Sequence, residues 1–173
     1  LPAAHPVQKL PPYRVPCQAG QLWRWDGVDF QVLHPVADDY ARALKTNAMS
    51  CVLRIEAGGQ SMLLTGDIEA REESSLVSGA PTAIRSVVLL VPHHGSRTSS
   101  TTEFIDAVAP RLAVISAGYR NRFGHPRADI EARYRARDID IARTDQSGTV
   151  RIELSPSGMS WSAFRTTHPR YWR

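Results

Sequence analysis

The pattern of turns along this chain changes near residue 67, and this change constrains the fold more than any other feature. Before it, short apolar segments are joined by the two-residue turns Asp26-Gly27 and Gly58-Gly59, which are typical of antiparallel hairpins. After it, apolar runs alternate with segments of helical composition. Strands followed by alternating helices and strands predict a sheet covered by helices, in the α/β (α+β) class.

The expected elements follow from apolar periodicity and from turn residues. We expect Ser99 or Ser100 to cap one helix, and Pro126 to be the first residue of another. The expected strands are 21–25, 29–34, 50–56, 61–65, 87–91, 112–116, 140–143, 149–154 and 159–164. The expected helices are 68–78, 101–108 and 126–137, with a weak helix or loop at 36–45.

The length of 173 residues corresponds to about one domain. Residues 1–16 are rich in proline and lack periodicity, so we expect a linker or a remnant of an upstream part. Residues 17–164 form the domain itself, and 165–173 form a basic tail. The chain does not begin with Met and has no signal-peptide pattern, so we expect an excised or processed piece. No apolar stretch approaches the ~20 residues of a membrane helix.

The net charge of +4 is concentrated in the second half of the chain. Residues 87–173 carry thirteen basic side chains, all Arg, and eight acidic ones. Arg binds phosphate through a bidentate fork, so this half is compatible with a nucleic-acid partner. The alternative is an ordinary solvated surface.

The two cysteines, Cys17 and Cys51, do not form a CxxC pair, which excludes a zinc ribbon or a thioredoxin motif. We expect two buried free thiols. The alternative is a single disulfide, which would place the domain in an oxidising compartment.

Three predicted strand ends carry residues suited to chemistry. The first is Met62-Leu-Leu-Thr-Gly-Asp67, where a strand delivers a carboxylate to a position at which open α/β folds bind ligands. An Asp after a strand is also a common helix N-cap, and that alternative stays open.

The second is Val91-Pro-His93-His94-Gly-Ser96. Imidazole is a common metal ligand, and one ring could bind metal while the other transfers a proton or contacts substrate. Ser96 could donate a hydrogen bond to an anion. A polar loop with incidental histidines is the alternative.

The third is Gly118-Tyr-Arg120-Asn121-Arg122-Phe-Gly-His125-Pro126, which precedes a predicted helix. Arg120, Asn121 and Arg122 could hold a phosphate beside the helix N-terminus. His125 is either a metal ligand or a residue that caps the helix.

Taken together, these segments resemble the C-terminal part of the ComEC family of DNA-uptake proteins over roughly residues 15–155. The motifs that carry the resemblance are Cys17-Gln-Ala-Gly20, Trp23 and Trp25-Asp-Gly, Asn47-Ala-Met-Ser50, Leu-Leu-Thr-Gly-Asp67, Val-Pro-His93-His94-Gly-Ser96, Gly124-His125-Pro126, and Thr144 with Gly148.

The resemblance implies a metallo-β-lactamase-like αββα sandwich. It also implies part of a metal-dependent, nuclease-like domain that degrades or handles the DNA strand left outside during natural transformation. The superfamily's first metal motif, of HxHxDH type, is absent from the chain. We therefore expect the N-terminal strands and that motif to be missing, and the chain alone to be inactive.

The resemblance also implies the site. Asp67 matches a metal-bridging carboxylate, His94 and His125 match later ligand positions, and His93 is the expected proton-transfer group. The expected catalytic residues are thus His93 and Asp67, the metal ligands Asp67, His94 and His125, and the substrate groups Ser96, Arg120, Asn121 and Arg122. The complete domain would bind two divalent ions, Zn or Mn; this chain would bind metal weakly or not at all.

The expected partners are DNA and the rest of the same membrane channel, with this chain as a soluble domain of a bacterial inner-membrane protein. Missing strands would leave exposed sheet edges, so a homo-oligomer is also expected. Two alternatives remain: a non-catalytic DNA-guiding module, or another hydrolase of the same fold.

Overall fold

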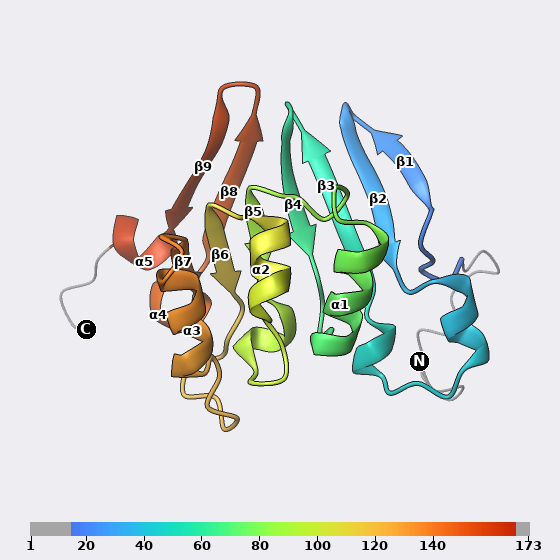
Figure 1. Cartoon of the computed structure of the whole chain (residues 1–173). Helices are drawn as coiled ribbons and strands as arrows, with labels where there is room; N and C mark the ends of the chain where they lie inside the picture. The colour runs from blue at the N-terminus through green and yellow to red at the C-terminus, as the bar shows by residue number, and fades with distance from the viewer. Residues whose placement is uncertain (1–14, 169–173) are drawn as a thin grey trace, which may run out of the picture.

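The computed structural model describes residues 15–168 (Figure 1), and the expectations for the linker before residue 15 and the tail after 168 lie outside that range. Within it, the chain forms a seven-stranded mixed sheet of order β1-β2-β3-β4-β5-β6-β7 and a two-stranded sheet, β8-β9. The expected mixed α/β class is therefore confirmed.

The first half is antiparallel β, as the glycine turns predicted. Positive φ angles at Asp26 and Gly27, and at Gly58 and Gly59, turn the chain between neighbouring strands. The strands are β1 (Leu22–Trp25), β2 (Val28–His34), β3 (Val52–Ala57) and β4 (Gln60–Leu64), with the short 3-10 helices η2 (Ala37–Ala41) and η3 (Asn47–Met49) between β2 and β3.

The second half continues the sheet with parallel strands joined by helices. The pairs β4–β5, β5–β6 and β6–β7 are all parallel, so the carboxyl ends of these four strands lie at one edge, the lower edge in Figure 1. The elements are α1 (Ala70–Gly79), β5 (Val88–Leu90), η4 (Pro92–Gly95), α2 (Thr102–Val108), β6 (Leu112–Ile115), α3 (Ala128–Arg135) and β7 (Asp140–Arg143).

Both predicted helix starts were wrong in detail. Thr101, rather than Ser99 or Ser100, is the N-cap of α2, and its hydroxyl accepts a hydrogen bond from the Phe104 N–H. Ser100 is instead buried, and its N–H donates to the Glu73 carboxylate. Helix α3 begins two residues after Pro126.

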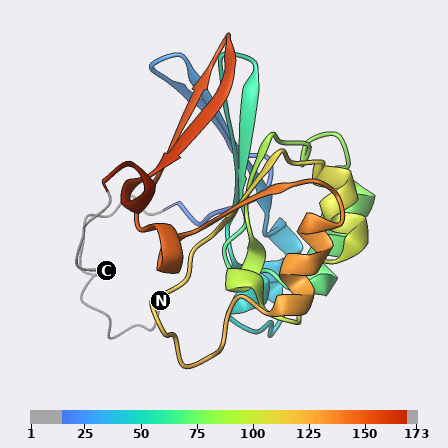
Figure 2. The same cartoon turned by 90° about the vertical axis from the view of Figure 1, so that its left-hand side faces the viewer.

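The molecule has three layers. Helices α1, α2 and α3 lie on one face of the large sheet, and the hairpin of β8 (Val150–Ser155) and β9 (Gly158–Ala163) lies on the other (Figure 2). The helix side holds the main apolar core. A smaller core lies between the sheet and the hairpin and includes Val88, Leu112 and Val114. Two single-turn helices, α4 (Thr144–Ser147) and α5 (Phe164–Thr167), flank the hairpin. None of the described helices is long and apolar enough to cross a membrane.

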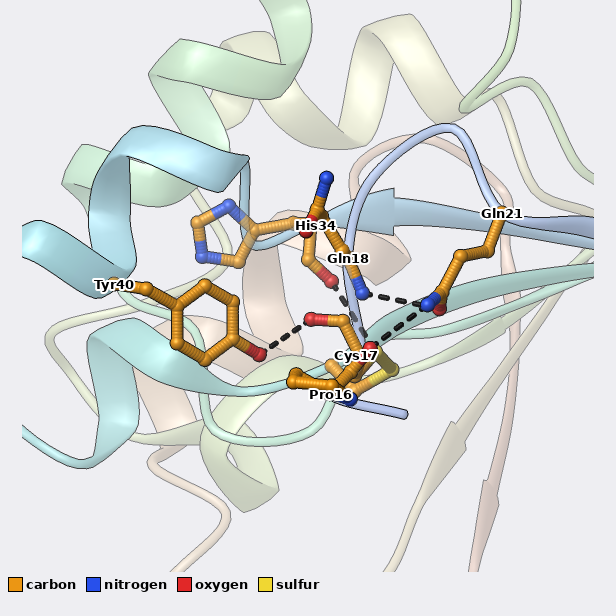
Figure 3. Close-up of a disulfide and its surroundings, with 7 residues drawn as sticks. Pro16, Cys17, Gln18, Gln21, His34 and Tyr40 are labelled. Carbon is orange, nitrogen blue, oxygen red and sulfur yellow. Dashed lines mark hydrogen bonds between the residues drawn. A yellow bond between two sulfur atoms is a disulfide. The ribbon is translucent and has the colours of Figure 1, made fainter. Parts of the chain in front are cut away.

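The expectation of free thiols was wrong, because Cys17 and Cys51 form a disulfide (Figure 3). Neither half-cystine is buried; Cys51 lies exposed just before β3. The segment around Cys17 returns along the sheet, with the Ala19 N–H donating to the Pro35 carbonyl and the Tyr40 hydroxyl donating to the Cys17 carbonyl. The disulfide depends on these tertiary contacts, which bring the Cys17 segment next to Cys51.

Candidate functional site

The parallel strands bring the three predicted motifs to one edge of the sheet. Asp67 follows β4, His93 and His94 follow β5, and His125 lies in the long connection after β6. The His93 ring centroid is 6.4 Å from that of His94 and 6.0 Å from that of His125. The structure thus gathers the three histidines that the sequence singled out.

The Asp67 carboxylate and the His94 ring form a pair, with Oδ1 3.4 Å from Nε2. The other ring nitrogen, Nδ1, lies 2.8 Å from the Ser116 carbonyl, which can only accept a hydrogen bond. Nδ1 therefore carries a proton, and in the neutral ring the Nε2 lone pair faces the carboxylate. Two electron-rich atoms that face one another favour a cation or a shared proton between them.

His93 has a different environment. Its Nδ1 lies 3.2 Å from the Glu69 Oε1, and its Nε2 lies 3.5 Å from the Asn47 amide nitrogen. This arrangement suits a ring that donates from Nδ1 to Glu69 and keeps a lone pair on Nε2. A carboxylate behind an imidazole fixes its tautomer and orientation, as a proton-transfer group requires.

The turn that presents the two histidines is conformationally unusual. His93 and His94 have positive φ angles of 47° and 57°, followed by Gly95 at 78°. Such backbone is uncommon for residues other than glycine and persists where the surroundings hold it in place. Here the Gly95 carbonyl accepts from the Arg127 N–H, and Pro126 packs directly over Gly95.

That contact also positions His125. Its Nδ1 is buried and, among the described residues, has no hydrogen-bond partner. Burial, together with the neighbouring charges of His93, His94 and Arg127, lowers the pKa of His125 below its ordinary value of 6.5. The neutral imidazole is the form that binds metal.

The donor set for a metal is only partly assembled. A catalytic zinc site uses about three protein ligands, but within residues 15–168 no three His, Cys, Asp or Glu side chains gather closely enough to hold an ion. Asp67 and His94 supply two adjacent donors. His125, with its unpartnered nitrogen, lines the same cleft of about 470 Å³ as His94. The residues present therefore fit part of a metal shell and not a complete one.

The predicted substrate groups divide into two kinds. Ser96 and Asn121 are engaged locally: the Ser96 hydroxyl bonds Thr98, and the Asn121 amide bonds the backbone of His125. Arg120 and Arg122 are exposed. Their roles toward a substrate stay predictions.

Sequence reasoning missed Glu69 and Asn47 as members of the site. Asn47 belongs to a motif that carried the family resemblance, and Glu69 lies two residues after Asp67. Neither position carried a signal of its own, because their contact with His93 arises only when the segments before β3 and after β4 meet the turn after β5.

These features define a class: a mixed α/β chain with a carboxylate–histidine cluster at the carboxyl ends of its parallel strands. No protein-family model matches the chain. It is 41% identical over 155 residues to Competence protein ComA of Neisseria gonorrhoeae, covering 90% of this chain and 22% of that protein. It is 40% identical over 131 residues to ComE operon protein 3 of Bacillus subtilis, covering 76% and 16%. For Recombination protein 2 of Haemophilus influenzae the identity is 36%, with 89% and 19% covered.

The chain therefore spans about a fifth of the length of these relatives. Their names support a ComEC-related competence family.

Proposed function

We propose that this chain is a DNA-handling segment of a bacterial competence protein and carries part of the hydrolase centre of a metallo-β-lactamase-like domain. The observation that carries the proposal is the convergence of Asp67, His93, His94 and His125 at the edge where four parallel strands end. The 41% identity with Competence protein ComA supports the DNA-uptake context, together with the 40% identity with ComE operon protein 3.

Each residue has a distinct role in this proposal. Asp67 and His94 would hold a divalent ion, Zn or Mn, with His125 as the candidate for a further nitrogen. The bound ion would supply Lewis acidity and an activated water for phosphodiester hydrolysis. His93, held by Glu69, exchanges a proton at Nε2, while Arg120 and Arg122 bind the phosphates.

The disulfide indicates in which compartment this segment of the protein lies. Disulfides persist in oxidising compartments and are rare in the cytosol. The Cys17–Cys51 pair therefore favours the oxidising side of the bacterial inner membrane for this segment of the proposed channel protein.

Metal binding and DNA binding by the 173-residue chain test the proposal. With only two adjacent donors assembled, we expect weak binding of Zn and Mn by calorimetric titration and little cleavage of single- or double-stranded DNA. Asp67→Asn and His94→Ala should each weaken metal binding at least tenfold. The matched controls are Asp38→Asn, at an exposed position of η2, and His168→Ala, after α5.

Equal metal affinity in all four variants would contradict the assigned ligands, and absence of DNA binding would contradict the function. DNA binding that persists without any metal binding would favour the non-catalytic, DNA-guiding alternative. Tight stoichiometric metal with rapid cleavage would show that the donor set is complete.

A further inference from the structure

The connection between β6 and α3 has an unusual composition. Residues 118–127 contain three Arg and no acidic residue, together with the aromatic residues Tyr119 and Phe123. Both aromatic side chains are largely exposed, at 70% and 65%. Large apolar rings that remain in water beside a candidate site call for a physical explanation.

Each ring is paired with a guanidinium group. The Arg120 Cζ lies 5.2 Å from the centre of the Tyr119 ring, and the Arg122 Cζ lies 4.9 Å from the centre of the Phe123 ring. The loop therefore presents two units, each an aromatic surface for stacking beside a positive charge for a phosphate.

The two units lie on two different clefts. Phe123 lines the cleft of about 470 Å³ that also contains His94 and His125, and its ring is within 14° of parallel to the His125 ring. Tyr119 lines a second cleft of about 770 Å³, with Arg120 and Arg165. One aromatic residue thus borders the candidate site, and the other borders a second cleft whose lining includes two arginines and also Asp145, which is itself paired with Arg143.

The loop that carries the units is braced. The Asn121 amide nitrogen donates to the His125 carbonyl, and its oxygen accepts from the His125 N–H. The Gly124 N–H donates to the Asn121 carbonyl. Asn121 is therefore held in place, and Tyr119 and Phe123 each lie two residues away from it. A loop that is already ordered loses less conformational entropy when a ligand binds.

We infer that the loop 118–125 is a base-stacking platform for single-stranded DNA, which leads a strand from the second cleft across Tyr119 and Phe123 to the histidine cluster. The faces of bases are accessible in a single strand and are already stacked in a duplex, so exposed rings beside phosphate-binding arginines select the single strand. This inference rests on the proposed DNA-handling function and adds the form of DNA and the residues that select it.

The test compares two oligonucleotides with the same number of phosphates: a 12-residue oligothymidine and its abasic counterpart. Fluorescence anisotropy with the 173-residue chain should show tighter binding of oligothymidine. Tyr119→Ala with Phe123→Ala should weaken oligothymidine binding by about tenfold or more per ring, and should leave abasic binding nearly unchanged. Tyr119→Phe with Phe123→Trp should restore the preference.

Trp25→Ala is the matched control, because Trp25 is an equally exposed aromatic residue on β1, at the opposite edge of the sheet from β7. It should leave the preference intact, and circular dichroism should show each variant folded. Equal binding of the two oligonucleotides, or an unchanged preference in the double variant, would overturn the platform while leaving DNA binding itself in place. Failure to bind either oligonucleotide would overturn the proposed function instead.

Discussion

At the residue scale, Arg143 forms a closely paired charge cluster outside the candidate site. Its guanidinium donates to both oxygens of Asp145 and to a Glu131 oxygen. All three side chains are largely shielded from solvent. The contribution of this cluster to the free energy of unfolding should therefore differ between neutral and acidic pH.

The hydrogen bond from Arg143 lowers the pKa of the Asp145 carboxyl below its ordinary value of 3.8. A lowered pKa in the folded state means that the ionised carboxylate stabilises the fold above pH 3.8, and that this contribution is lost as pH falls through the folded-state pKa. Asp145→Asn should lower the unfolding free energy by about 2 kcal/mol at pH 7, the scale of a hydrogen bond to a charged group.

Urea unfolding between pH 7 and pH 3 measures this difference, which should shrink at the acidic end. Asp138→Asn, at an exposed turn position, is the control and should have little effect. A difference that stays constant with pH would mean that the Asp145 charge is not the source of the stability.

At the element scale, the contact between η4 and the start of α3 holds the histidine turn. A Cβ on Gly95 would lie 2.7 Å from the Pro126 Cβ, and the Gly95 φ of 78° disfavours any side chain. Gly95→Ala should therefore destabilise the chain by about 2 kcal/mol, from overpacking and backbone strain.

Gly79→Ala is the control, because a Cβ there meets nothing within 4 Å and the φ is not positive. Gly79 lies in α1, where alanine is the better helix former, so this change should be neutral or stabilising. Thermal unfolding of the two variants compares them directly, and similar losses in both would argue against the packing explanation.

The helices and strands show how much of the fold can be predicted from the sequence. Within residues 15–168, the glycine turns and apolar runs predicted the nine strands and three main helices to within a few residues, because local conformation and periodicity decide them. The N-cap of α2 was missed because Glu73, distant in sequence, binds the Ser100 and Thr101 N–H groups. The cysteine pairing and the contact of Glu69 with His93 were missed for a similar reason: each depends on segments that only the tertiary fold brings together.

At the scale of the whole molecule, the two faces of the large sheet are covered unequally. Strand pairing places Trp23, Phe30, Ile55, Met62 and Val88 in one row across β1 to β5. The β8–β9 hairpin buries Val88 and packs against Met62. The hairpin covers less of the same face toward β1. There, Phe30 and Ile55 are only partly buried, and Trp23 is 45% exposed.

Strand β1 is at the edge of this sheet, and all four of its residues are exposed, with Trp25 at 74%. An exposed edge next to an uncovered apolar face promotes pairing with another strand. We therefore expect the 173-residue chain to self-associate through β1 and this face, with the fraction of oligomer rising with protein concentration. Replacing both Trp23 and Trp25 by Ser should shift the chain toward monomer.

Sedimentation velocity over a hundredfold range of concentration measures this shift. Tyr119→Ser is the matched control, since Tyr119 is also an exposed aromatic residue but lies in the connection after β6, away from β1. It should leave association unchanged. A chain that stays monomeric at the highest concentration would show that Arg24 and the short length of β1 suffice to protect the edge, because charge and brevity are the means by which edge strands resist pairing.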